Sequence, residues 1–323
     1  MIDFRYHLVS LIAVFLAIAL GVVIGTTALN SGLLDNLQTQ VTGLQEDKRE
    51  LEDQTQGLQA QLDATGGFAE EVGTALVAGT LPGATVVLVV GNEDVETELV
   101  EEVTALVEAA GASVTGTVRL TPEYSDPQTE QSLQSYVTGP GGLPTGVTLP
   151  ETDDTGELVA SLLVQVLQVP PAAEGEEPVV PDSTATSQVL AGLSALDVLS
   201  LDSPSVAAAD HAVFLTSGSL SAEDAEARNT ALVQLALALD EQGQGTVVAG
   251  DAASAGETGL VGTVRADTEA STQVSTVDNV NAPEGRISAV LALASEAQGT
   301  SGKYGTGEDA QPVPPVPTPA PAN

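Results

Sequence analysis

An uncharged segment near the amino terminus constrains this chain more than any other feature. From Leu8 to Leu29 there is no charged residue. A helix of this length extends ~33 Å at ~1.5 Å per residue, which spans a bilayer core of ~30 Å. The alternative is a cleavable signal peptide processed near 26–28, but the apolar part of such peptides is usually only ~7–15 residues long. We therefore expect one transmembrane helix over residues 8–29.

The charges on either side of this segment predict its orientation. Arg5 precedes it, and the first charge after it is Asp35. Because basic residues are retained on the cytoplasmic side, residues 1–7 should be cytoplasmic and everything after Asn30 should lie outside the cell. This pattern predicts a single-pass protein of the cell membrane with an extracytoplasmic main domain.

Small residues recur every four positions in this segment, at Ala13, Ala17, Gly21 and Gly25. Residues with this spacing share one face of a helix, and small side chains there allow a second transmembrane helix to approach closely. Ordinary small residues in a chain rich in Gly and Ala explain the pattern equally well. We expect Ala17, Gly21 and Gly25 to be the contact positions if a helix pairs here.

Residues 33–63 carry a heptad pattern that predicts a parallel coiled coil. Every d position is leucine, and Lys48 and Thr55 are polar a residues that disfavour higher oligomers. Two copies anchored in one membrane would have to run parallel, so we expect a parallel homodimer. The alternative is a lone amphipathic helix packed on the following domain. The predicted dimer seam comprises Leu34, Leu37, Val41, Leu44, Lys48, Leu51, Thr55, Leu58 and Leu62.

The small-residue face and the leucine seam are out of phase. The nine residues from Gly25 to Leu34 rotate a straight helix by about 180°, so the two faces lie on opposite sides. Asn30, Ser31 and Gly32 are weak helix formers that could break or reorient the helix. The alternative is that the glycine face receives a different transmembrane partner.

Residues 84–299 predict an extracytoplasmic α/β domain, with a mostly parallel sheet and helices on both faces. Gly66-Gly67 should end the rod, a short helix should occupy 68–78, and Pro82-Gly83 should open the domain. Apolar β-branched runs alternate with amphipathic stretches, the pattern of βαβ units. Strands are expected at 85–90, 113–119, 198–201, 211–215, 246–250 and 273–277, helices at 95–110, 128–137, 155–168, 186–195, 222–241 and 284–298, exposed loops at 139–150 and 169–182, and a disordered Pro-rich tail at 300–323.

Composition excludes several functions. The chain has 45 Asp plus Glu against 8 Lys plus Arg, so its field repels nucleic acid. It has no Cys and one Met, Met1, so it lacks the sulfur ligands that Cu(I) prefers. Its many carboxylates contain no D-x-D-x-D-G calcium loop. We therefore expect no bound metal and no cofactor.

No catalytic motif is convincing. The loop that follows the first strand reads GNEDVE, which places two acids where a dinucleotide pyrophosphate would bind. Ser254 lies in a loop resembling a nucleophile elbow, and His211 is the one histidine on the predicted extracytoplasmic side that could serve as its base. A serine hydrolase using this pair is an unfavoured alternative, because a strand-edge histidine and a loop serine are commoner. We therefore expect that this protein is not an enzyme.

Three stretches resemble the actinobacterial copper-transport protein B family, which also includes coiled-coil division proteins. They are MIDFRYHLVSLIAVFLAIALGVVIGTTAL at the start, VSTVDNVNAPEGRISAVLAL within 274–293, and the later GKYG. The resemblance covers essentially the whole chain up to the proline tail. It implies a cell-envelope protein with a role in copper efflux or homeostasis, or, alternatively, in a membrane complex that regulates cell-wall hydrolysis at division.

The residues favour a scaffold over a channel. A pore needs several spans or a closed barrel, and one helix with a soluble domain supplies neither. We therefore expect a non-enzymatic dimeric scaffold or accessory that binds another envelope protein. The family offers no catalytic motif to transfer, so Val274–Leu293 is interpreted only as strand, turn and helix, with Pro283 at the helix start.

Overall fold

The computed structural model describes residues 4–139, 143–144, 146–171, 178–221, 223 and 225–315; the side chains of residues 4 and 26–35 lie outside this description. The chain divides into two compact units, Met1–Thr65 and Gly66–Asn323.

A single helix, α1 (Phe4–Val77), contains the apolar segment and the leucine heptads. It is helical through Asn30–Gly32 and also through Gly66-Gly67. The predicted end of the rod at Gly66-Gly67 and the separate helix at 68–78 are therefore wrong. A helical glycine costs only ~1 kcal/mol relative to alanine. The last turns offset that cost by packing, since Ala69 and Val77 are buried in the second unit.

The second unit is an α/β domain, which confirms the predicted fold class. Within the described residues its seven-stranded sheet has the order β3-β2-β1-β4-β5-β6-β7, and every strand pair is parallel except β2–β3. The strands are β1 (Thr85–Val90), β2 (Ser113–Leu120), β3 (Leu199–Leu201), β4 (His211–Leu215), β5 (Thr246–Ala249), β6 (Ser275–Val277) and β7 (Lys303–Tyr304). The helices are α2 (Thr97–Ala109), η1 (Pro122–Tyr124), α3 (Glu130–Thr138), α4 (Thr155–Leu167), α5 (Ser183–Ala195), α6 (Ala225–Gln242), α7 (Leu260–Ala266), α8 (Ala270–Gln273) and α9 (Pro283–Glu296).

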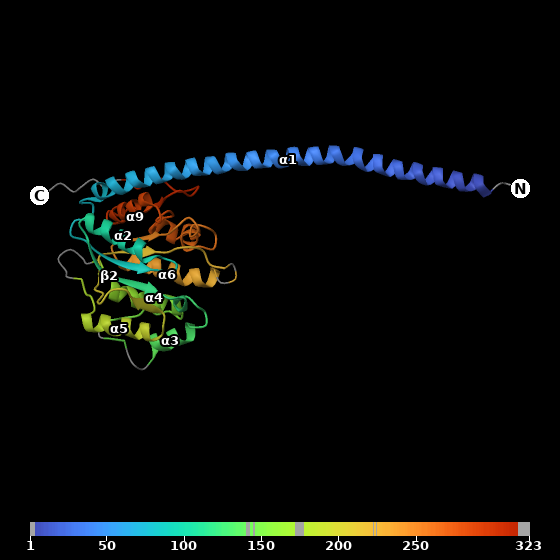
Figure 1. Ribbon diagram of the computed structural model, residues 1–323. Coiled ribbons are helices and arrows are strands. Elements are labelled where there is room, and N and C mark those ends of the chain that lie inside the picture. Colours follow the sequence, from blue (N-terminus) through green and yellow to red (C-terminus); the bar gives the residue numbers. More distant parts are fainter. Residues whose placement is uncertain are drawn as a thin grey trace. The chain divides into compact units, whose positions relative to one another are not determined.

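Side-chain alternation along β1 feeds two hydrophobic cores, one on each face of the sheet. Val87 and Val89 pack with α3 to α7, whereas Val86, Leu88 and Val90 pack with α2, α9 and the end of α1. Figure 1 shows α2 and α9 on one side of the sheet and α4 and α5 on the other. A sheet covered on both faces explains why its central strands are continuous apolar runs.

The last strand corrects the prediction of a disordered tail from residue 300. β7 is held by Asp278, whose carboxylate accepts hydrogen bonds from the backbone N–H groups of Thr306 and Gly307 and from Arg265 at 2.7 Å. Burial tends to raise the pKa of Asp278, but these three donors outweigh it and lower the pKa. The ordered domain therefore extends beyond residue 299. Residues 316–323 lie outside the described residues.

Two carboxyl groups lie at the amino-terminal ends of β5 and β6, where Asp240 accepts from the backbone N–H of Thr246 and Glu296 from that of Ser275. Glu296, at the end of α9, accepts a hydrogen bond from the backbone N–H of Ser275 at 2.7 Å. Burial and, to a smaller extent, the charge of Asp240 raise the pKa of Glu296 to about 8, although the hydrogen bonds from Ser275 lower it. Burial also raises the pKa of Asp240 to about 6. Both groups therefore hold their protons to a higher pH in the folded chain than in the unfolded chain.

The domain should lose stability between about pH 5 and pH 8, because the unfolded chain releases the Glu296 proton near the ordinary pKa while the folded chain retains it to about 8. The substitution Glu296→Gln should flatten this profile and raise the free energy of unfolding at pH 8 by roughly 1–3 kcal/mol. Urea unfolding followed by tyrosine fluorescence measures it, since the chain has no Trp. Glu108→Gln, at an exposed site on α2, is the control. Equal profiles for wild type and Glu296→Gln would contradict the prediction.

Candidate functional site

A crevice of about 400 Å³ opens where the parallel strands end. Its walls come from the segments that follow β1, β4, β5 and β6, together with α2, the start of α9 and one residue near the end of α1. Its lining residues are Glu70, Asp94, Val95, Glu96, Glu98, Leu99, Glu102, Thr216, Ser217, Asp251, Val280, Asn281, Pro283 and Arg286. All of them belong to the second compact unit.

The connectivity of the sheet explains why a crevice forms there. β1 continues through α2 to β2 on one side, whereas β4, which pairs with β1, continues through α6 to β5 on the other side. Adjacent strands whose connections leave in opposite directions separate the loops at their carboxyl ends. In open α/β sheets this switch point is the usual place for a ligand.

Hydrogen bonds between loops hold one end of the crevice in shape. Asp251 accepts from the Ser217 hydroxyl at 3.0 Å, from the backbone N–H of Gly218, and from the backbone N–H of Ser254 at 2.8 Å. The Asn92 side-chain amide donates to the Ser217 carbonyl oxygen at 2.6 Å. The loops after β1, β4 and β5 are thereby tied together. Asp251 is engaged by these loops and has little capacity left for a ligand.

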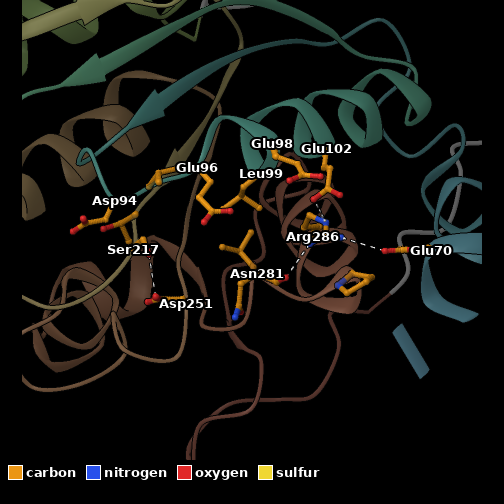
Figure 2. A pocket seen from close by; sticks show the side chains of 14 residues that line it. Glu70, Asp94, Glu96, Glu98, Leu99, Glu102, Ser217, Asp251, Asn281 and Arg286 are labelled. Atoms are coloured by element: carbon orange, nitrogen blue, oxygen red, sulfur yellow. Dashed lines mark hydrogen bonds and ion pairs between the residues drawn. The ribbon is translucent and has the colours of Figure 1, made fainter. Parts of the chain in front are cut away.

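The other end of the crevice is organised around Arg286, as Figure 2 shows. Its guanidinium lies 3.2 Å from the Glu102 carboxylate and 3.8 Å from that of Glu70, and it donates to the Asn281 carbonyl oxygen at 3.1 Å. The Arg286 side chain is only 9% exposed, while both acidic partners are more open to solvent. Arg286 therefore bridges α1, α2 and α9.

Acidic residues dominate the wall between these two ends. Asp94 and Glu96 follow β1, and Glu98 lies in the first turn of α2. Among the lining residues Arg286 is the one cation, and its charge is already shared by two carboxylates. The crevice therefore has a negative potential that disfavours phosphate-bearing ligands.

The structure does not bring Ser254 and His211 together. His211 begins β4 beside Ala212, which pairs with Thr246, the first residue of β5. Ser254 comes five residues after the last residue of β5, so the two lie beyond opposite ends of this four-residue strand, ~10 Å or more apart. Ser254 is fully buried and its hydroxyl donates to the Asp251 carbonyl oxygen at 2.6 Å. Burial lowers the pKa of His211.

The predicted dimer seam lies on α1 in the first unit. The side chains of Leu37, Val41, Leu44, Leu51, Leu58 and Leu62 are 51–68% exposed. Lys48 forms an ion pair with Glu52, and the Thr55 hydroxyl donates to the Leu51 carbonyl oxygen. The side chain of Leu34 lies outside the described residues. The seam is thus an exposed apolar stripe whose pairing no contact in the structure tests.

The apolar segment of α1 is long enough to cross a membrane. Within the described residues one such stretch is found, Arg5–Gly25, with 21 residues and a mean hydropathy of 2.9. Ala17 is exposed, and a side chain at Gly21 or Gly25 would meet nothing within 4 Å. The predicted contact face is therefore open, and its partner stays a prediction.

Metal-binding chemistry is sparse in the part of the chain that the structure describes. There, no three or more His, Cys, Asp or Glu side chains gather in a group that could hold a metal ion. The acids around Arg286 and Asp251 are engaged as described above.

Comparison with known proteins places the chain in a family. A family model described as "Copper transport outer membrane protein, MctB" matches residues 1–315. The chain belongs to the MctB family. The "Copper transporter MctB" of Mycobacterium tuberculosis (strain ATCC 25618 / H37Rv) is 34% identical over 318 residues, covering 97% of this chain and 99% of the relative. The protein of the same name from Mycobacterium leprae (strain TN) is also 34% identical, covering 96% and 98%.

Membership of the MctB family confirms the resemblance drawn from the sequence and connects the chain with copper transport and a membrane. Sequence reasoning missed the crevice. A usable signal was present, because polar or acidic residues follow β1, β4, β5 and β6 directly, and carboxyl ends of parallel strands share one edge. The role of Arg286 could not be recognised in the sequence, because its acidic partners lie on two other helices, α1 and α2.

Removing the charge of Arg286 should destabilise the domain. The substitution Arg286→Met keeps most of the side-chain volume but leaves Glu70 and Glu102 near each other without a cation. We expect a loss of roughly 1–3 kcal/mol, discounted because the acids are partly exposed. Adding Glu102→Gln should recover part of this loss, and urea unfolding measures both. If the double variant is no more stable than Arg286→Met, the ion pairs are not the cause.

Proposed function

We propose that this protein is a membrane-anchored, non-enzymatic accessory in copper handling. It pairs as a parallel homodimer through the leucine stripe of α1 and presents its acidic α/β domain to another envelope protein. In this proposal the apolar segment crosses the cell membrane once, with the amino terminus in the cytoplasm and the α/β domain outside.

The observation that carries the proposal is the exposed leucine stripe. Six large apolar side chains, Leu37, Val41, Leu44, Leu51, Leu58 and Leu62, are each at least half exposed on a helix otherwise rich in polar residues. A soluble helix rarely exposes such a regular stripe without a partner. The 3–4 spacing suits a second identical helix.

Two features support an accessory role over a copper conduit. Within the described residues one stretch is long and apolar enough to cross a membrane, whereas a pathway for ions needs several helices around it. The same residues supply no group of potential metal ligands. The copper connection rests on the family, whose named relatives are copper transporters.

The positions of the candidate catalytic residues support a non-enzymatic role. The serine and histidine that a hydrolase would need lie at opposite ends of the parallel strands, and Ser254 is buried. In the crevice the Ser217 hydroxyl is hydrogen-bonded to the Asp251 carboxylate. This pair holds neighbouring loops together and is not arranged as a nucleophile with its base. Binding is therefore the activity that this domain supports best.

Full-length wild-type protein in detergent should sediment as a dimer. The double substitution Leu44→Ser and Leu51→Ser removes two d-position leucines from each copy and should raise the dissociation constant roughly 100-fold or more. The matched control is Glu46→Ser with Asp53→Ser, which has the same seven-residue spacing on the opposite face. Sedimentation equilibrium in density-matched detergent measures each. A monomeric wild-type protein would refute the dimer.

Direct copper binding should be weak. The chain offers no Cys and a single Met for Cu(I), so calorimetric titration of the full-length protein with Cu(I) and Cu(II) should show no tight stoichiometric site. Micromolar or stronger binding of one copper ion per chain would replace the accessory role by one in which the protein holds the metal itself.

A further inference from the structure

The leucine seam of α1 contains one charged residue, Lys48, at an a position. The residues that flank Lys48 differ from those that flank the other seam residues. In a parallel pair of helices, the e and g positions flank the a and d residues. Most of these flanking residues are glutamine: Gln38, Gln40, Gln45, Gln54, Gln59 and Gln61. Between Leu34 and Leu62 there are two exceptions, Asp47 at g and Glu52 at e, and both lie beside Lys48.

Within one chain, Lys48 already pairs with Glu52. Its Nζ lies 3.1 Å from Glu52 Oε1, in an i,i+4 arrangement whose side chains are 75% and 54% exposed. An ion pair this exposed contributes little to the stability of a lone helix. The ion pair does, however, fix the direction of the lysine side chain. It holds the ammonium group on the e side of the helix. In a parallel in-register pair, that side faces the g positions of the second copy.

We propose that Lys48, Asp47 and Glu52 of two copies form one charged layer that holds the chains parallel and in register. This inference rests on the dimer proposed above. In this layer Glu52 of one copy faces Asp47 of the second copy, and the two carboxylates would repel each other if they were alone. Lys48 lies between them and attracts both. The layer therefore holds two ammonium groups and four carboxylates.

Other alignments lose this compensation. A shift of one heptad brings Lys48 beside Gln40 and Gln45 of the second copy, or beside Gln54 and Gln59. The ammonium group would then keep only Glu52 of its own chain, 3.1 Å away, and would lose the attraction of Asp47 in the second copy. The leucines at d cannot discriminate between these alignments, because every heptad carries one. Lys48 and its two acids are thus the residues of this seam that specify register.

Charge reversal in full-length protein in detergent tests the layer. Lys48→Glu places six carboxylates in it and should raise the dimer dissociation constant about tenfold or more at low ionic strength, with a smaller effect at high ionic strength. The neighbouring Arg49→Glu makes the same change in net charge at a b position, away from the seam, and should leave dimerisation nearly unchanged. Lys48→Glu with Glu52→Lys restores opposite charges across the pair and should restore the dimer.

Register can be measured directly because the chain has no cysteine of its own. Leu44→Cys should form a disulfide between identical positions of two copies, whereas a mixture of Leu44→Cys and Leu51→Cys proteins should give little crossed product. Adding Lys48→Leu to both should increase the crossed product. Equal effects of Lys48→Glu and Arg49→Glu, or crossed product already present with Lys48 intact, would overturn the charged layer while leaving the dimer in place. A wild-type monomer would instead refute the dimer itself.

Discussion

The pairing of β1 with β4 is the interaction on which the α/β domain depends. Residues Val86–Val90 are buried on both faces of the sheet and supply apolar side chains to both cores. The register aligns Val86 with His211 and Val90 with Leu215, so the two strands end together. Because their connections then leave in opposite directions, the crevice is a consequence of this pairing. The strand pairing thus positions the segments after β1 and β4, which both contribute to the walls of the crevice.

The distribution of the few cations sets the electrostatics of the domain. Arg119, Arg228, Arg265 and Arg286 each form an ion pair with a carboxylate, and most of these guanidinium groups are largely buried. They join segments distant in sequence, so they serve the fold and leave the surface acids uncompensated. With a formal net charge of −37, the chain presents a field that repels anionic surfaces over about a Debye length. A partner would have to be neutral or basic where it approaches the domain.

The strands that could be predicted from sequence are those whose own residues carry a pattern. β1 and β4 are continuous apolar runs bounded by polar residues, and their predicted limits match the structure. β7 has two residues and no pattern, and it exists because Asp278 binds a segment about 28 residues further along the chain. The helix through Gly66-Gly67 was unpredictable for a similar reason. Its stabilising contacts, such as the close approach of Gly73 to Ile287, come from α9.

The same distinction applies to the candidate site and to the seam. The crevice combines residues from many segments, and the bridging role of Arg286 depends on helices that are distant in sequence. The seam is periodic, so it was readable locally, including its polar interruptions. In the proposed dimer, Lys48 and Thr55 weaken a seam of little more than four heptads. Anchoring both copies in one membrane raises their effective concentration, so a weak seam can still pair. When both copies are anchored in this way, the seam need not supply high affinity. Lys48 can then lower the stability of the dimer and still be useful, because it favours one alignment of the two helices over the others.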